Sequence, residues 1–127
     1  MERTVGNLER EFAEVTEHWS PRVVASMNGQ YVKLAKVKGE FVWHDHAGED
    51  ELFIVQRGTL HIRYRDGGEV VLRAGDFHVV PRGVEHQPYA PEECWLMLVE
   101  PAETKHTGDV ETALTKSVAA QTAHLAD

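Results

Sequence analysis

Cysteine is almost missing from the sequence: Cys94 is the single one among 127 residues. One cysteine excludes an internal disulfide and a metal site built from several thiolates. We expect Cys94 to be a buried or edge residue that carries no chemistry. A reducing compartment is the simplest setting for such a chain, and MERTVGNLEREF at the start lacks the apolar core of a secretory signal. We therefore expect a cytoplasmic protein.

Long apolar runs and an excess of basic residues are also missing. No segment approaches the roughly 20 apolar residues of a membrane-spanning helix, so the sequence predicts no span. The 13 lysines and arginines are outnumbered by 21 aspartates and glutamates, and the formal net charge is -8. Nucleic-acid binding requires a basic face that neutralises phosphates. We therefore expect no nucleic-acid partner and no anionic membrane partner.

The length fits one domain, and it is sufficient to bury a core without a structural metal. Residues 8–19 predict a short amphipathic helix, because their apolar side chains recur at helical spacing behind Asn7, a good N-cap residue. These apolar residues are Leu8, Phe12, Val15 and Trp19. The helix is expected to pack on the domain or on a partner subunit.

From residue 22 onward, short runs of strand-forming residues alternate with turn signals. The expected strands are 22–27, 31–38, 41–46, 51–56, 59–65, 69–73, 77–80 and 95–100. Asn28-Gly29 predicts a tight hairpin, because both residues tolerate positive φ. The pattern predicts an all-β domain, a sandwich or barrel, over 22–101. The segment 1–21 is expected to be helical, and the polar residues 102–127 to form a weakly structured tail.

The stretch FVWHDHAGEDELFIVQRG contains two histidines one residue apart. Side chains two apart on a strand share a face, so His44 and His46 can point toward one interior point. The turn that follows brings Glu51 back toward the same point. Imidazole nitrogens and a carboxylate oxygen suit a divalent transition metal. Glu49 is the alternative carboxylate, but it is expected on the turn, facing water.

A second stretch, GDFHVVPRGVEH, can supply a further histidine ligand to this group. Pro81 fixes a turn, and His86 follows at the start of a further strand. In an antiparallel barrel that strand can lie beside the first histidine pair, giving three imidazoles and one carboxylate around a metal. A shell of this kind keeps positions open for water or substrate.

These two stretches resemble the two sequence motifs of the cupin superfamily. The first motif is matched by Gly39, His44, His46, Glu51 and Gly58, with four residues between Gly39 and His44 where five are usual. The second is matched by Gly75, Pro81, Gly83 and His86, whereas its final asparagine is Ala90 here. The spacing between the motifs is similar to that of small single-domain bacterial cupins.

The resemblance implies a jelly-roll β-barrel of antiparallel strands with a divalent transition metal inside: manganese, iron, nickel, copper or zinc. The implied ligands are His44, His46, Glu51 and His86. It also implies a metal-dependent enzyme of dioxygenase, isomerase or lyase type acting on a small organic molecule. The alternative is a non-catalytic module that holds a sugar-like ligand in the same pocket. Small cupins resemble one another in forming homodimers through outer strands, so we expect a homodimer.

Five other histidines are expected to be packed or solvent-exposed residues rather than metal ligands. His61 and His78 lie within expected strands, where a histidine is more often packed or exposed than a ligand. His18, His106 and His124 lie in the flanking segments and are expected to face solvent.

Overall fold

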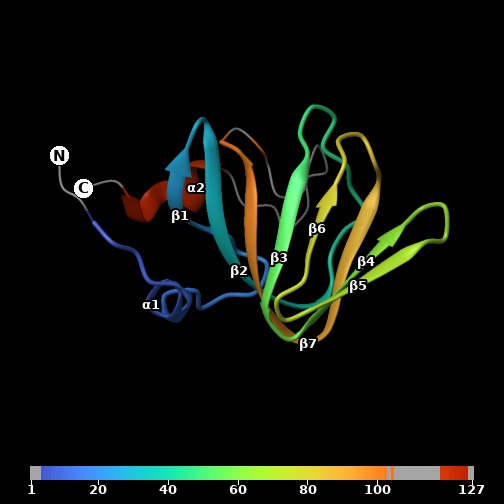
Figure 1. Cartoon of the computed structure of the whole chain (residues 1–127), viewed down its shortest axis with the longest axis horizontal. Helices are drawn as coiled ribbons and strands as arrows, with labels where there is room; N and C mark the ends of the chain where they lie inside the picture. Colours follow the sequence, from blue (N-terminus) through green and yellow to red (C-terminus); the bar gives the residue numbers. More distant parts are fainter. Residues whose placement is uncertain (1–3, 103, 105–117, 126–127) are drawn as a thin grey trace.

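The computed structural model describes residues 4–102, 104 and 118–125. Most of the described chain is antiparallel strand, as the sequence predicts (Figure 1). The elements in chain order are α1 (Leu8–Ala13), β1 (Arg22–Met27), β2 (Gln30–Glu40), β3 (Glu51–Arg57), β4 (Thr59–Tyr64), β5 (Glu69–Arg73), β6 (Phe77–Val80), β7 (His86–Pro101), α2 (Val118–Thr122) and the 3-10 turn η1 (Ala123–Leu125).

The strands form one curved antiparallel system with the order β1-β2-β7-β3-β6, and β4 pairs with both β5 and β7. Strand β7 is 16 residues long. Its first half pairs with β4 and its second half with β3, while β2 follows it along most of its length. A single long strand therefore belongs to both walls, and the sheet closes around a core as a barrel.

Alternation along the strands puts one set of apolar side chains inside the barrel. The buried set is Ala35, Val37, Phe53, Val55, Leu60, Ile62, Leu72, Val80, Ala90, Cys94, Leu96 and Leu98. Burying a large aliphatic or aromatic side chain contributes roughly 1.5–3 kcal/mol. Cys94 is fully buried, and burial raises the pKa of its thiol to about 12. The expected burial of Cys94 is confirmed.

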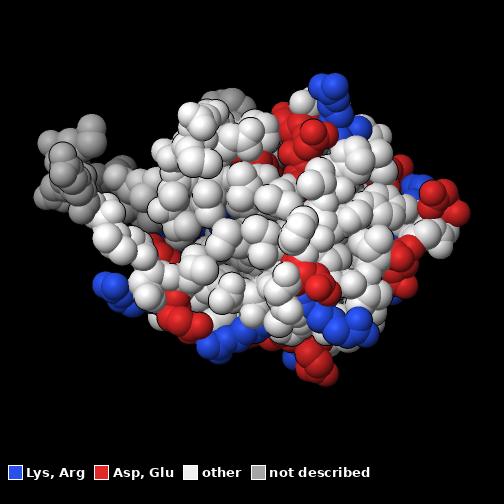
Figure 2. Space-filling view, viewed as in Figure 1, with Lys and Arg blue, Asp and Glu red and all other residues white. Residues whose placement is uncertain are grey.

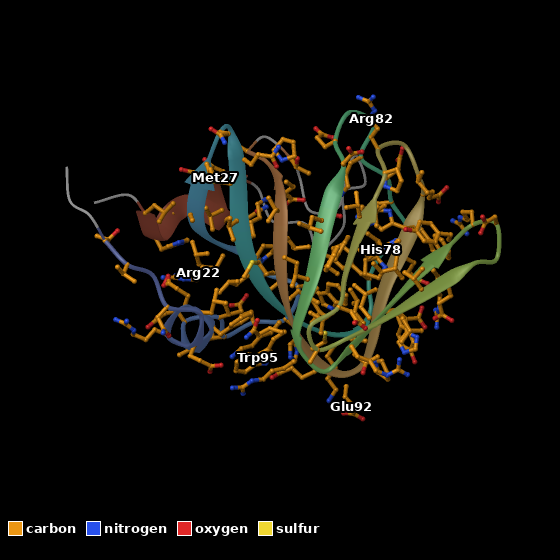
Figure 3. All side chains as sticks on the ribbon, in the orientation of Figure 1. Arg22, Met27, His78, Arg82, Glu92 and Trp95 are labelled. Atoms are coloured by element: carbon orange, nitrogen blue, oxygen red, sulfur yellow. The ribbon has the colours of Figure 1, made fainter. Side chains whose placement is uncertain are left out.

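Helix α1 packs on the outer face of the sheet. The Asn7 side chain accepts a hydrogen bond from the Arg10 backbone N–H at 3.0 Å, which confirms the predicted cap. Phe12 is buried and its ring stacks on that of Trp95, with ring centroids 4.8 Å apart. Figure 3 shows Trp95 close to α1, at one end of the sheet.

The helix ends at Ala13, so the predicted extent of 8–19 is too long. The backbone N–H of Val15 donates to the carbonyl of Phe12, which tightens the last turn. His18 then forms a parallel bridge with Lys36 on β2, and Trp19 joins the barrel core. Pairing with the sheet and burial of the indole outweigh the helical preference of this segment.

The expected strand 41–46 is also wrong. These residues form a loop with one isolated bridge, in which His44 and His86 exchange backbone hydrogen bonds of 2.9 and 3.0 Å. In contrast, the strand expected at 95–100 begins nine residues earlier, at His86. The loop pairs with β7 at separate points, such as Phe41 with the Pro88 carbonyl at 2.9 Å, so no continuous ladder forms.

The C-terminal segment is described at 102, 104 and 118–125, where α2 and η1 lie; His106 lies outside the described residues. The η1 residue His124 is exposed, and its Nε2 lies 2.6 Å from the Val23 carbonyl oxygen. The division into segments 1–21, 22–101 and 102–127 stays a prediction. Within the described ranges, no helix has the length and apolar character to cross a membrane.

Candidate metal centre

Four side chains from two distant parts of the chain meet inside the barrel. His44 and His46 come from the loop before β3, Glu51 is the first residue of β3, and His86 the first of β7. One ligand atom from each lies within 4.8 Å of the others, and all four residues are buried. The Nε2 atoms of His46 and His86 lie 3.4 and 3.7 Å from Glu51 Oε1.

Backbone carbonyls fix two of the imidazole rings. Nδ1–H of His44 donates to the Val42 carbonyl at 2.9 Å, and Nδ1–H of His86 donates to the Val84 carbonyl at 2.9 Å. In both residues the acceptor lies two positions earlier in the chain. With the proton on Nδ1, the lone pair is on Nε2, which is the usual arrangement of a metal-binding histidine.

The donor set fits a divalent cation. His46 Nε2, Glu51 Oε1 and His86 Nε2 are buried and have no hydrogen-bond partner. A buried polar atom without a partner costs about 1–3 kcal/mol, so three of them in one place are expensive to leave unsatisfied. Nitrogen and carboxylate ligands of this kind suit first-row transition metals. The four residues could therefore hold such an ion.

The pKa shifts of Glu51 and His44 favour the forms that bind metal, whereas that of His46 favours its protonated form in the absence of an ion. Burial opposes ionisation of Glu51, but the close approach of the Glu100, His46 and His86 side chains holds its pKa well below the usual range. Burial, together with repulsion from His86, lowers the pKa of His44 to about 4. Burial also opposes the charge on His46, but the contact with Glu51 outweighs it and raises that pKa. At neutral pH Glu51 is a carboxylate and His44 a neutral imidazole.

The loops of the two motifs are tied together beside the group. The Arg82 backbone N–H donates to Asp50 Oδ1 at 2.9 Å, and that of Gly83 donates to the His46 carbonyl at 2.8 Å. Glu49, the alternative carboxylate, is half-buried on the turn and is not part of the group. The structure therefore brings together the four residues expected from the sequence and leaves Glu49 out.

A second buried polar pair lies next to Glu51, and the sequence analysis missed it. Lys33 Nζ lies 2.7 Å from Glu100 Oε1, and both side chains are fully buried. Lys33 also donates to the Thr104 carbonyl at 3.3 Å. Burial and the charge of Glu51 raise the pKa of Glu100 well above its usual value. Strict alternation places Lys33 in register with Ala35 on the inner face of β2, and that signal could have found it.

An apolar pocket opens onto two members of the group, His44 and Glu51. Val37, Phe53 and Leu96 are among its walls, and Trp19 from the segment after α1 completes it. About 30 Å³ of it is open to the centre of a water molecule, where one water needs roughly 10–15 Å³. Sequence reasoning missed Trp19, because its spacing from Val15 also fits a helix.

The other described histidines have partners away from this group. His61 Nδ1 lies 3.0 Å from Glu69 Oε1, and the hydroxyl of Tyr64 lies 2.6 Å from His78 Nε2. Figure 3 shows His78 among the strands on the β6 side of the barrel. His18 is exposed, as predicted, and its Nε2 lies 2.8 Å from Glu93 Oε2. Of the described residues, these three histidines neither join the metal group nor line the apolar pocket.

The fold and the site together define a small antiparallel β-barrel with a buried three-histidine, one-glutamate candidate metal centre. The family model described as "Cupin domain" matches residues 30–100. The chain belongs to the cupin family, and the expected jelly-roll barrel is confirmed.

Two solved structures and one further relative support the same assignment. A cupin-2 domain protein from Shewanella frigidimarina is 54% identical, covers 76% of this chain and 94% of its own, and superposes with a TM-score of 0.74. Protein NMB1881 from Neisseria meningitidis is 31% identical and covers 77% of this chain and 99% of its own, with a TM-score of 0.72. Protein YdbB of Bacillus subtilis is 39% identical over 74 residues, which span 58% of this chain and 66% of YdbB, just under two thirds of its length.

Proposed function

We propose that this cupin is a cytoplasmic enzyme that uses a divalent transition metal to act on a small organic molecule. The proposed ligands are His44, His46, Glu51 and His86. The observation that carries the proposal is the convergence of their ligand atoms within 4.8 Å, with three buried atoms that lack any hydrogen-bond partner. Manganese, iron, nickel, copper and zinc all accept such ligands.

The residues of the chain have separable roles in this proposal. The carbonyls of Val42 and Val84 orient two imidazoles, and Glu51 supplies the one negative charge. The apolar pocket excludes bulk water, which strengthens electrostatic interactions at the site. A divalent ion bound there supplies a Lewis acid that polarises a substrate oxygen. Dioxygenase, isomerase and lyase chemistry are all compatible with this arrangement.

The pocket favours a largely apolar substrate over a sugar. Aliphatic and aromatic side chains form nearly all of its lining, and no lysine or arginine is among the described lining residues. A sugar or sugar phosphate needs several hydrogen-bond donors and acceptors around it, because its hydroxyls lose water on binding. We therefore infer a small molecule with one or two oxygen atoms directed at the metal ligands.

A non-catalytic binding protein is the alternative function. His44 and Glu51 are the only ionisable side chains among the described lining residues, and both are proposed metal ligands. The described pocket thus offers no additional acid or base for proton transfer. In this alternative the metal and the apolar walls would hold a small ligand without converting it.

The deciding experiment compares metal content and turnover. The purified protein is analysed by plasma mass spectrometry and reloaded with each candidate metal. It is then assayed with small enols and keto acids, with and without dioxygen. Turnover that His86→Ala abolishes, while His61→Ala retains it, supports the enzyme. Ligand binding without turnover across the panel supports the binding protein, and a wild-type chain that takes up no metal contradicts both.

We also propose that the protein is a homodimer that pairs through its outer sheet face. Register pairs align an outer row of Ala25, Val32, Val99, Leu52 and Val79 across five strands. Phe77 stands beside this row and is 72% exposed, and Val79 is 46% exposed. Figure 2 shows the face as largely uncharged, with charged residues nearer its rim. An apolar patch of this kind is typical of an interface, and a two-fold pairing would bury it on both copies.

A further inference from the structure

The wall between the apolar pocket and solvent is formed by one residue, Trp19. Among the lining residues, all of which lie in the described part of the chain, Trp19 is half-buried and every other one is buried. The indole also packs against the barrel core. Solvent therefore meets the pocket at the indole ring, and the size of that ring affects how much space lies behind it.

The backbone of Trp19 adopts a conformation that an aromatic residue rarely takes. Its φ is 57°, and within the described ranges the only other non-glycine residue with positive φ is Asn28, in a hairpin turn. Asparagine tolerates this region, whereas a bulky side chain enters it only where the surroundings over-determine its position. The ring of Trp19 is therefore held in place against a local backbone preference.

Several contacts provide that restraint. The backbone N–H of Trp19 donates to the Lys36 carbonyl at 2.9 Å, and the indole N–H donates to the Lys38 carbonyl at 2.9 Å. The ring stacks on Phe41, with centroids 4.4 Å apart and planes 14° apart. Phe41 in turn meets His44 edge-on, with centroids 5.6 Å apart. The indole is thus connected to the candidate metal ligands through one intervening ring.

The space left behind the indole is small. About 30 Å³ is open to the centre of a water molecule, whereas an apolar protein cavity that binds benzene measures on the order of 150 Å³. Five of the other wall residues belong to the buried barrel core, where side chains are close-packed: Ala35, Val37, Phe53, Leu96 and Leu98. Pro21, Phe41 and His44 also lie outside the strands, but they are buried. Trp19 is the half-buried wall element, so its side chain sets the upper limit on ligand size.

We propose that Trp19 is a specificity-determining residue that restricts the metal site to ligands of a few heavy atoms. The inference rests on the proposed function, because it takes this pocket as the ligand site. Removing the indole enlarges the pocket and admits a single aromatic ring. Trp43 is the matched control: it is half-buried, lies under the Arg65 guanidinium at 4.0 Å, and does not line the pocket.

The first arm of the test uses benzene and metal-free protein, followed by NMR titration. Wild type and Trp43→Ala are expected to show no saturable binding, whereas Trp19→Ala binds benzene at least tenfold more tightly. A wild-type protein that binds benzene as tightly as the variant overturns the proposal, as does a folded Trp19→Ala with no gain. If Trp19→Ala does not fold, Trp19→Leu decides, with an expected gain of at least threefold.

The second arm uses Co²⁺-loaded protein and its visible spectrum. Azide is expected to bind wild type and Trp19→Ala within about twofold of each other, and 4-phenylimidazole only Trp19→Ala, as expected when a size limit is removed. Equal 4-phenylimidazole binding to both proteins overturns the proposal. A protein that takes up no Co²⁺ refutes the proposed metal function, while the benzene arm still decides the role of Trp19.

Discussion

Inside the barrel, His46 Nε2, Glu51 Oε1 and His86 Nε2 are buried without a hydrogen-bond partner. On the outer face of the sheet, Phe77 and Val79 leave 72% and 46% of their surface exposed. The two regions thus reverse the usual distribution of polar and apolar groups. Each reversal is the basis of one proposal: a cation bound by the inner group, and a second copy of the chain on the outer face.

The core between these regions follows the usual rule that apolar side chains are buried, so the inner polar group and the exposed outer row stand out as exceptions. Helix α1 covers one end of the outer face through Phe12 and Val15, which pack on Leu34. The outer row lies beyond this cover. The Lys33–Glu100 pair, in contrast, places a buried ammonium 2.7 Å from a buried carboxyl oxygen. Substitutions in the metal group, the buried ion pair and the outer face should therefore reduce different properties: metal binding, stability and dimer assembly.

The largest expected effect is on the inner group. Replacing His44 and His46 together with alanine removes two of four ligands, and metal affinity should fall at least ~100-fold, because even changes to residues behind the ligands cost 10–100-fold. Metal content of the purified protein, measured by plasma mass spectrometry, checks this. His61→Ala combined with His78→Ala is the control and should leave metal content unchanged. Equal metal content in both double variants would mean that the ion binds elsewhere.

Substitutions in the buried Lys33–Glu100 pair should lower the free energy of unfolding. Lys33→Met leaves the Glu100 carboxyl buried without its counter-charge, which costs about 3–5 kcal/mol, whereas Lys33→Met with Glu100→Leu should recover most of the loss. Urea denaturation followed by circular dichroism measures both. Lys38→Met, at an exposed position on the same strand, is the control and should change the free energy of unfolding by less than about 0.5 kcal/mol. A single variant as stable as the double variant would contradict the prediction.

A charged substitution on the outer sheet face should weaken the dimer. Phe77→Asp places two carboxylates in a two-fold interface. The dissociation constant of the dimer should therefore rise about 100-fold, which corresponds to a loss of ~2.7 kcal/mol of binding free energy. Sedimentation across a concentration series measures the dissociation constant. Val71→Asp changes an exposed valine on β5, outside the outer row, and should leave assembly unaffected. A wild-type monomer at all concentrations would remove the dimer proposal.

The smallest expected effect lies in the apolar core between the two regions. Cys94→Ser introduces a hydroxyl into a fully buried position, and the cost should be about 1–3 kcal/mol. Thermal unfolding checks this, with Cys94→Ala as the control for lost volume. The thiol, whose pKa burial raises to about 12, should resist alkylation until the protein unfolds. A serine variant more stable than the alanine variant would indicate a hydrogen-bond partner for the hydroxyl.

The sequence predicted the strands and the ligand group because local signals specify them. Asn28-Gly29, the glycine turns and the alternating strands depend on nearby residues alone. The group could be anticipated from the spacing of His44, His46 and Glu51, with His86 following its own turn. The structure places Glu51 rather than Glu49 in the group, because Glu51 opens β3 and is buried on the same face as Phe53.

The errors arose where distant pairing overrides local preference. Residues 41–46 have strand-like composition but meet β7 only at separate points, so no ladder forms. Trp19 fits a helical stripe, yet the bridge between His18 and Lys36 draws that segment onto the barrel. Neither contact has a signal in the local sequence.

The sequence by itself predicted which four side chains meet in the candidate metal centre, because their spacing around the two turns brings them together even though His44 and His46 lie in a loop. Only the tertiary structure decided what surrounds them. The Lys33–Glu100 pair, the size of the pocket and the placement of Trp19 all depend on which strands and segments lie side by side. Such contacts join residues far apart in the chain, and their energies depend on packing that no local pattern encodes.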